Sequence, residues 1–547
     1  MAQMVDEGPD FDVIVVGAGF SGLYMLYRLR ELGFKVKVLE AGDGVGGTWH
    51  WNRYPGARCD VPSLAYSFGF DPDLEQEWQW TEKYPPQPEI LAYLNHVADR
   101  FDLRRDIQLE TRVVGARFED ADEMWSLETE TGETMRSRFC VMATGALSIP
   151  KNPEFPGADT FAGESYVTSE WPAEGVDFAG KRVGVIGTGS TGIQVIPQVA
   201  RQAERLTVFQ RTPNFSVPAQ NTPLDPELEA KTKAEYQDYR RRQHDSIFGV
   251  PTPVGEKSAL AVDEDELTEN LERIWANGSP SEFLLSYTDL GLDADANERV
   301  AEFVRRKIRE TVKDPEVAEM LCPDDHPIGT KRICVDIDYF ETYNRDNVSL
   351  VDVRADPIVE ITPTGIRTGG SSYDLDVIVY AIGFDAMTGA LLSIDPIGRD
   401  GVRLAAAWKD GPRSFLGLGV AGFPNLFTET GPMSPSVLSN MVVSIEQHIN
   451  WIANCIAYLR DHDLTEIDPD PDAQEKWVEH VRTIADSTLY PQADSWYVGA
   501  NVPGKPRVFM PYVGGVNIYD AEIRRIAEEG YPGFKLSGPR ELARSDA

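Results

Sequence analysis

Residues 11–40 read FDVIVVGAGFSGLYMLYRLRELGFKVKVLE, and this stretch decides the fold. An apolar run leads into GAGFSG and then into a helix-like segment, which predicts a strand, a tight turn and a helix. Gly17, Gly19 and Gly22 allow the turn, the close backbone approach and the helix packing that place a pyrophosphate on a helix N-terminus. Glu40 ends the next predicted strand, where a carboxylate would accept hydrogen bonds from a ribose diol. The module is therefore predicted to bind FAD or NAD.

A second copy of this pattern begins 170 residues later. Gly187, Gly189 and Gly192 repeat the turn, but the following predicted strand ends at Arg211, so a base stands where the first copy has an acid. A guanidinium there can form a two-pronged contact with a 2′-phosphate, which favours NADPH over NADH. The remaining predicted contacts of this module are Ser190, Thr191 and Thr212. One acidic-ended and one basic-ended site are the arrangement expected when NADPH delivers hydride to a bound flavin, FAD.

The composition excludes several classes of function. The 547 residues carry a formal net charge of -36, which would repel nucleic acid and anionic lipid surfaces. No segment approaches the roughly 18 consecutive apolar residues of a membrane span, and the acidic N-terminus lacks a secretory signal, so a cytoplasmic location is expected. The five cysteines form no CxxC pair and the seven histidines show no ligand spacing, so neither dithiol chemistry nor a metal centre is expected.

The order of segments predicts discontinuous domains. Between residues 223 and 325 glycine is sparse and charged, helix-favouring stretches dominate, which indicates a helical insertion. The later strand-like segments NVSLVDV and DVIVYAIG are expected to return to the second module, and the helix-like PSVLSNMVVSIEQHINWIANCI to the first. The predicted fold class is α/β, with two Rossmann-like domains. The predicted boundaries are 1–150 and 384–547 for the two parts of the FAD-binding domain, 151–221 and 329–383 for those of the NADP-binding domain, and 222–328 for the insertion.

Four stretches resemble one family over nearly the whole chain. They are GGTWHWNRYPGARCD at residues 46–60, FAGESYVTSEWP at 161–172, GTKRICVDIDYFETYNRDNV at 329–348 and SWYVGANVPGKPRVF at 495–509. In these stretches the sequence resembles the Baeyer–Villiger monooxygenases, the family of cyclohexanone, phenylacetone and steroid monooxygenases. A disulfide reductase would share the two modules, but the chain lacks the dithiol that such an enzyme needs.

The second stretch departs from the family pattern at one position. Phe161, Gly163, Trp171 and Pro172 match the family fingerprint FxGxxxHxxxWP, but Val167 occupies the position of its histidine. Because valine cannot make the polar contacts of a histidine, we expect oxygenation to survive while the coupling between NADPH oxidation and ester formation is altered.

The resemblance implies a reaction and its catalytic residues. Reduced flavin would react with dioxygen to give a flavin peroxide, whose anion attacks a ketone carbonyl to yield an ester or lactone. Such an anion needs a cation that stays charged in a desolvated pocket, and arginine meets this need. Arg332 matches the family's catalytic arginine and Asp60 its carboxylate partner. Lys331 and Arg211 match contacts to the phosphate of NADPH, and Trp496 matches a residue on a mobile segment that closes over the site.

Two further groups of residues follow from the resemblance. The segment GPMSPSVLSN resembles the loop that lines the ketone pocket, and its predicted substrate contacts are Met433, Ser436, Val437 and Leu438. The residues predicted to lie around the flavin, with ordinary core packing as the alternative, are Gly47, Thr48, Trp49, Trp51 and Tyr54.

Two other functions remain open at this point. A heteroatom oxygenase would insert oxygen into a sulfide or amine and would not require Arg332. A redox sensor would bind FAD and NADP but turn over slowly. Ester formation from a ketone, at the expense of NADPH and dioxygen, separates the three functions. The sequence does not fix the ketone or the oligomeric state, and a monomer is compatible with it.

Overall fold

The computed structural model describes residues 9–539, and its centre is a seven-stranded sheet. Strands run in the order β3-β2-β1-β6-β5-β4, and β17 also pairs with β6. The strands are β1 (Phe11–Val16), β2 (Val36–Leu39), β3 (Ile107–Gln108), β4 (Val113–Glu119), β5 (Met124–Thr129), β6 (Thr134–Met142) and β17 (Leu426–Thr428). The pairs β1–β2, β1–β6, β2–β3 and β6–β17 are parallel, and β4–β5–β6 form an antiparallel meander. Val13, Ile14 and Val15 are fully buried, as expected for a strand covered on both faces.

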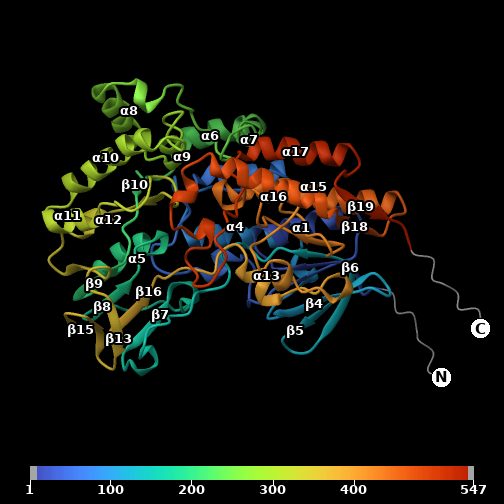
Figure 1. Cartoon of the computed structure of the whole chain (residues 1–547), viewed down its shortest axis with the longest axis horizontal. Coiled ribbons are helices and arrows are strands. Elements are labelled where there is room, and N and C mark those ends of the chain that lie inside the picture. Colours follow the sequence, from blue (N-terminus) through green and yellow to red (C-terminus); the bar gives the residue numbers. More distant parts are fainter. Residues whose placement is uncertain (1–8, 540–547) are drawn as a thin grey trace, which may run out of the picture.

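Helices from both ends of the chain cover this sheet. Helix α1 (Phe20–Glu31) packs against the long helix α15 (Met441–Asp461), which begins at an Asn440 cap and is buried along most of its length. The other helices of this part are α2 (Thr48–Trp51), α3 (Pro72–Glu77), α4 (Gln87–Arg100), α13 (Gly389–Ile394), α14 (Leu404–Ala407), α16 (Pro471–Asp486) and α17 (Val516–Glu528). A small antiparallel pair, β18 (Glu466–Pro469) and β19 (Phe534–Ser537), lies beside them (Figure 1).

The second sheet is parallel and has the order β12-β9-β8-β16-β7. Its elements are β7 (Glu164–Val167), β8 (Arg182–Ile186), α5 (Ser190–Ala200), β9 (Arg205–Gln210), β12 (Val348–Asp352) and β16 (Val377–Tyr380), with an antiparallel appendage of β13 (Ile358–Thr362), β14 (Gly365–Thr368) and β15 (Ser372–Asp374). The two sheets lie side by side in Figure 1. The predicted α/β class with two dinucleotide-binding modules is confirmed.

A layer of helices runs along the upper edge of the molecule in Figure 1, from above the second sheet to the helices of the first module. It contains α6 (Pro226–Ala234), α7 (Tyr236–His244), α8 (Glu264–Asn277), α9 (Pro280–Leu284), α10 (Ala294–Thr311) and α11 (Pro315–Leu321). In α10 an Asp293 cap starts the helix, and Val300, Val304 and Ile308 recur every fourth residue on its buried face. The parallel pair β10 (Ser216–Pro218) and β11 (Cys334–Asp336) joins the two ends of this layer, with α12 (Tyr339–Thr342) after it.

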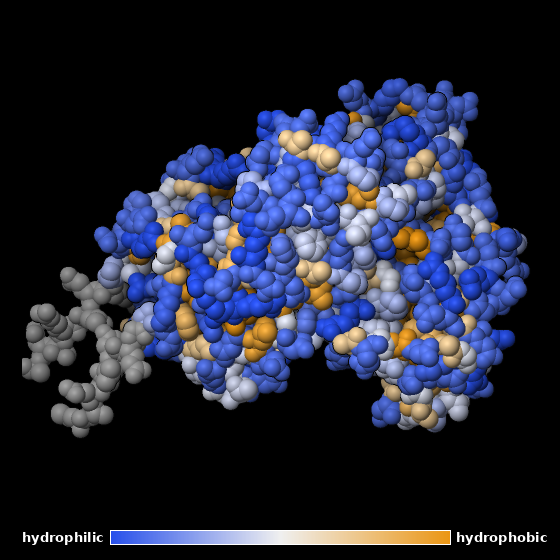
Figure 2. Space-filling view, turned by 180° about the vertical axis from the view of Figure 1, so that it is seen from behind, coloured by the Kyte–Doolittle hydropathy of each residue, from blue (hydrophilic) through white to orange (hydrophobic). Residues whose placement is uncertain are grey.

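The surface is strongly hydrophilic. Figure 2 shows a face on which hydrophilic residues dominate and apolar residues form small separate spots, with an indentation between the two lobes along the lower edge. Such a surface agrees with the net charge of -36. Within residues 9–539, no helix has the length and apolar character needed to cross a bilayer.

Candidate active site

The first glycine turn brings three backbone segments into close contact. Gly17 has a φ of +105°, and a Cβ there would lie 2.5 Å from the carbonyl oxygen of Ala143. A Cβ on Gly22 would lie 1.8 Å from the carbonyl oxygen of Gly17, and one on Gly47 would lie 2.9 Å from Cα of Gly19. The N-terminus of α1 has no side-chain cap, which leaves its N–H groups available to a phosphate. The turn therefore fits the pyrophosphate of FAD.

Glu40 lies directly after β2 and is only 5% exposed. Its Oε2 accepts a hydrogen bond of 2.7 Å from the Ala18 amide, and its Oε1 accepts one of 2.8 Å from the Gly42 amide. Each carboxylate oxygen can accept a second hydrogen bond, so the side chain keeps the capacity to bind a ribose diol.

The second glycine turn repeats this geometry. Gly187 has a φ of +111°, and a Cβ there would lie 2.4 Å from the carbonyl oxygen of Ala381. A Cβ on Gly192 would lie 2.3 Å from the Gly187 carbonyl oxygen, whereas one on Gly189 would meet no atom within 4 Å. In both modules, therefore, the residue that follows a neighbouring strand packs against the first glycine of the turn. This residue is Ala143 after β6 and Ala381 after β16.

The residues predicted around the second turn lie at one end of the sheet. Ser190 and Thr191 open α5, whose N-terminus again lacks a side-chain cap. The Ser190 hydroxyl accepts a hydrogen bond of 2.9 Å from the Cys334 thiol, and the carbonyl of Thr212 accepts one of 2.9 Å from the Thr188 hydroxyl. Thr212 is thereby fixed beside Arg211.

Three cations gather at the end of β9. Arg211 is exposed, Lys331 is half-buried, and Lys151 is a third member that the sequence did not suggest. Burial lowers the pKa of Lys331, and Arg211 lowers it further, although Asp325 acts in the opposite direction. Burial and Arg211 also lower the pKa of Lys151. None of the three side chains has an ion pair or hydrogen bond to another described residue, so together they form an anion site that fits a 2′-phosphate.

The segment of residues 46–60 connects the two modules. Trp49 is buried in the first core and donates a hydrogen bond of 3.2 Å to the Tyr66 hydroxyl, while Thr48 is exposed at the start of α2. Tyr54 instead donates a hydrogen bond of 2.8 Å to Gln194 of α5, in the second module. For Tyr54 the structure therefore shows a contact between modules that the prediction of a flavin contact did not foresee.

Asp60, at the end of that segment, meets Arg332, which lies two residues before the start of β11. Arg332 Nε donates to Asp60 Oδ2 at 2.6 Å, and Nη2 donates to Asp60 Oδ1 at 2.7 Å. Nη1 donates to the carbonyl oxygen of Val437 at 2.7 Å. Burial disfavours the charge of Arg332, but Asp60 more than offsets this effect, so the arginine pKa lies well above its ordinary value. The guanidinium is therefore permanently charged and fixed in orientation.

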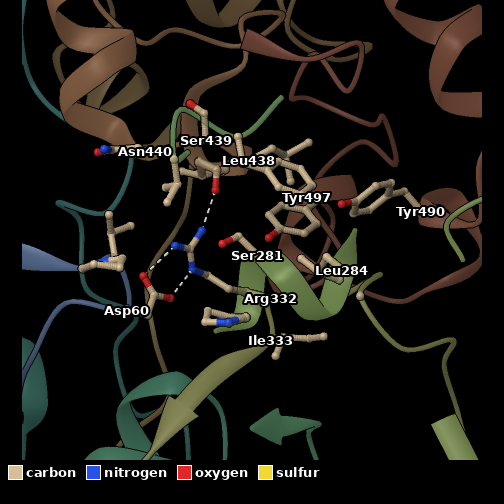
Figure 3. Close-up of a pocket in the computed structure, with 17 residues that line it drawn as sticks. Asp60, Ser281, Leu284, Arg332, Ile333, Leu438, Ser439, Asn440, Tyr490 and Tyr497 are labelled. Carbon is tan, nitrogen blue, oxygen red and sulfur yellow. Dashed lines mark hydrogen bonds and ion pairs between the residues drawn. The ribbon is translucent and has the colours of Figure 1, made fainter. Parts of the chain in front are cut away.

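A guanidinium has five N–H groups, and these three hydrogen bonds use three of them. The Arg332 side chain is 31% exposed and borders a pocket of about 610 Å³ of empty space. Figure 3 shows Arg332 between Asp60 on one side and Tyr497 and Tyr490 on the other. The arrangement can offer two charged N–H donors to an anionic oxygen in a largely apolar pocket.

Several known proteins are similar to this chain over nearly its whole length. A family model described as pyridine nucleotide-disulphide oxidoreductase matches residues 14–272. A Baeyer–Villiger monooxygenase of Pseudooceanicola batsensis (strain ATCC BAA-863 / DSM 15984 / KCTC 12145 / HTCC2597) is 42% identical, with 96% of each chain covered. The chain belongs to the Baeyer–Villiger monooxygenases.

Solved structures agree with this membership. A structure of oxidized steroid monooxygenase bound to NADP is 51% identical, covers 97% of this chain and 100% of its own, and has a TM-score of 0.93. A structure of OTEMO in complex with FAD and NADP is 41% identical over 97% and 100% of the two chains, with a TM-score of 0.94. The predictions of the family, of a monooxygenase and of FAD and NADPH as cofactors are confirmed.

The chain matches a disulphide oxidoreductase family model, but its cysteines are not arranged for disulfide chemistry. All five cysteines are buried and unpaired, and burial raises the pKa of Cys59 and Cys140 well above the ordinary value. Among residues 9–539, no three His, Cys, Asp or Glu side chains gather as a metal ion would require.

The pocket of this Baeyer–Villiger monooxygenase is lined by two of the four residues predicted to contact the substrate. Val437 and Leu438 line it, but Met433 and Ser436 do not. The Met433 carbonyl accepts a hydrogen bond of 3.0 Å from Trp477, and both Met433 and Ser436 are buried and have positive φ. Contact of these two residues with a substrate stays a prediction. The lining residues that the sequence did not suggest include Phe248, Val250, Pro280, Ser281, Leu284, Tyr490 and Tyr497.

The segment of residues 495–509 is docked over this site. Lys505 Nζ lies 2.5 Å from Asp385 Oδ1, and Asn501 donates a hydrogen bond of 2.7 Å to the carbonyl of Phe384. Trp496 is half-buried and packs beside Tyr497, with ring centroids 4.4 Å apart. These contacts anchor the segment to Phe384 and Asp385, which lie between β16 and α13. The role of Trp496 in closure stays a prediction.

Val167 ends β7 and pairs with Tyr380 in β16. Its half-buried side chain packs against a cluster of apolar residues that includes Ile186 and Phe209. An apolar side chain thus suits these surroundings. The effect of Val167 on coupling stays a prediction.

Proposed function

We propose that Arg332, held by Asp60, is the catalytic cation with which this monooxygenase converts a ketone into an ester or lactone. The observation that supports the proposal is the fixed guanidinium, which has two uncommitted N–H groups at the pocket. When bound, FAD that NADPH has reduced activates dioxygen for attack on the ketone carbonyl.

The residues of the chain have separate tasks in this reaction. Arg332 stabilises the negative charge that develops on oxygen during the attack. Asp60 and the Val437 carbonyl hold the guanidinium in one orientation, so no free energy is spent on ordering it when the charge develops. Leu284, Val437 and Leu438 exclude water from the carbonyl and strengthen these electrostatic contacts.

The test of this function is product formation with the purified holoenzyme. NADPH consumption, dioxygen uptake and ester formation are measured with a panel of ketones that runs from acetone to a steroid ketone. We expect at least one ketone to stimulate NADPH oxidation and to give one ester per dioxygen consumed. Oxidation of an organic sulfide without ester from any ketone would instead show a heteroatom oxygenase.

We further propose that Arg211, Lys331 and Lys151 bind the 2′-phosphate of NADPH. A charge-assisted hydrogen bond contributes about 1.5–3 kcal/mol, so Arg211→Ala should raise the Kd of NADPH by roughly 10- to 150-fold and leave that of NADH unchanged. Titration of both nucleotides onto the oxidised holoenzyme measures this. Arg205→Ala, at an exposed arginine that begins the same strand, is the matched control. Equal losses for NADPH and NADH would contradict the assignment.

A cytoplasmic location accords with this chemistry and stays a prediction, as do the domain boundaries.

A further inference from the structure

Tyr497 lines the pocket, and the proposed roles of Arg332 and Asp60 do not involve its hydroxyl group. The residue is 2% exposed, lies in the docked segment and lines the pocket that contains Arg332. Its backbone carbonyl accepts a hydrogen bond of 2.9 Å from the Met510 amide. The ring contacts Trp496, Tyr490 and Phe509, with centroids 4.4, 5.9 and 6.3 Å away. The side chain is therefore well fixed without any help from its hydroxyl.

The Tyr497 hydroxyl has no hydrogen-bond partner among residues 9–539. Some buried tyrosines use theirs: Tyr84 donates to the Gly278 carbonyl at 2.6 Å, and Tyr519 donates to the Leu416 carbonyl at 2.6 Å. The hydroxyl of Tyr380 has no partner either, but it is enclosed in the protein and does not line this pocket. The Tyr497 hydroxyl is not one of the fully enclosed unpaired polar atoms of the described residues, so it opens onto the pocket, where a ligand oxygen can accept its hydrogen bond. In Figure 3, Tyr497 lies on the side of Arg332 away from Asp60, and both Tyr497 and Arg332 line the pocket.

The protonation state of the Tyr497 hydroxyl allows it to donate a hydrogen bond. Burial raises the pKa of Tyr497 well above its ordinary value, and Arg332 lowers it by less. The group therefore remains an O–H at neutral pH. Tyr497 and Arg332 line the same pocket.

A ketone oxygen in that space can accept two hydrogen bonds. When the carbonyl carbon is attacked, electron density moves onto this oxygen, and a fixed donor then binds it more strongly than in the ground state. We propose that the Tyr497 hydroxyl is this donor and that it orients the substrate carbonyl and stabilises its oxygen beside Arg332. The proposal rests on the proposed function, because it requires a ketone in the pocket.

The experiment compares Tyr497→Phe with the unaltered holoenzyme on a ketone and on an organic sulfide. The sulfide has no carbonyl oxygen, so it measures every other step of the cycle. We expect kcat/KM for ester formation to fall about 10-fold, a loss that matches a hydrogen bond to a partly charged oxygen. Sulfoxide formation and the rate of FAD reduction by NADPH should remain unchanged. The yield of ester per NADPH should fall, with hydrogen peroxide as the balance.

Tyr490→Phe is the matched control, because it removes the other unpaired hydroxyl of the same pocket and preserves the ring. We expect its effect on ester formation to be much smaller. Equal losses in the two variants, or equal losses on ketone and sulfide, would overturn the assignment to Tyr497. Unchanged ester formation in Tyr497→Phe would also overturn it. If the unaltered enzyme formed no ester at all, the proposed function would fail instead, so the two failures are distinguishable.

Discussion

Arg332→Ala is expected to lower ester formation by roughly 100-fold or more while FAD stays bound and NADPH still reduces it. The reason is the order of events: hydride transfer precedes the step in which negative charge develops on oxygen at the pocket. Arg332 is the charged donor at that place, since its remaining N–H groups border the pocket. Anaerobic reduction by NADPH and aerobic ester formation, measured on the same preparation, separate the two half-reactions.

The single variant leaves Asp60 without its partner, and an unpaired, largely buried carboxylate is destabilising. The double variant Asp60→Asn and Arg332→Gln removes both charges and keeps similar shapes, so it tests catalysis without that cost. It should bind FAD and form as little ester as the single variant. Arg345→Ala, at an exposed arginine whose hydrogen bond goes to Asn347, is the control for arginine loss in general. Near-normal ester formation by the double variant would refute the catalytic role of Arg332.

Local spacing made both cofactor sites predictable. Three glycines, a strand before them and the residue that ends the next strand all fall within 30 residues, so Glu40 and Arg211 could be placed at their turns from the sequence alone. The environment of the Glu40 carboxylate was harder to foresee. Two backbone amides already bind it, and the neighbour Gly42 provides one of them through a turn that has no sequence signature.

The pocket could be predicted only in part, because its walls come from segments that are distant in sequence. Arg332 and Asp60 are 272 residues apart and were paired through the resemblance, not through any periodicity. Ser281 and Leu284 come from the helical layer, where an amphipathic pattern indicates a buried face but not its partner. The positive φ angles of Met433 and Ser436 have no signature in the local sequence, because they depend on packing against the rest of the chain.

One long-range contact beneath the first glycine turn has consequences for pH. Glu429 and His448 are fully buried. Glu429 Oε2 accepts hydrogen bonds from the hydroxyls of Ser21 at 2.5 Å and Thr430 at 3.1 Å. Its Oε1 has no hydrogen bond and lies 3.7 Å from His448 Nδ1, which itself accepts a hydrogen bond of 3.0 Å from the Thr430 amide. Two acceptors facing each other favour a protonated carboxyl. Burial raises the pKa of Glu429 to about 7 and lowers that of His448 to about 3, so both groups are neutral between about pH 3 and pH 7.

The sign of the resulting pH dependence follows from linkage. Since the pKa of Glu429 is higher in the folded protein than its ordinary 4.5, the folded state binds the proton more tightly between these values. The contribution of Glu429 to stability is therefore complete below pH 4.5, falls as the pH rises to about 7, and stays reduced above it. Ionisation of this carboxyl should cost about 3 kcal/mol at pH 8.

Glu429→Gln should abolish this loss, because an amide has the shape of the protonated acid and can donate toward His448. Relative to the unaltered protein, the free energy of unfolding of the variant should rise by about 2.5 kcal/mol between pH 5 and pH 8, because a small part of the loss is already present at pH 5. Urea unfolding of the FAD-saturated protein at both pH values measures the difference. Glu479→Gln, at an exposed glutamate of α16, should show the same free energy difference at both pH values. A difference for Glu429→Gln that does not change with pH would mean that the carboxyl is already ionised at pH 5 in the folded protein, and that the opposed acceptors are accommodated in another way.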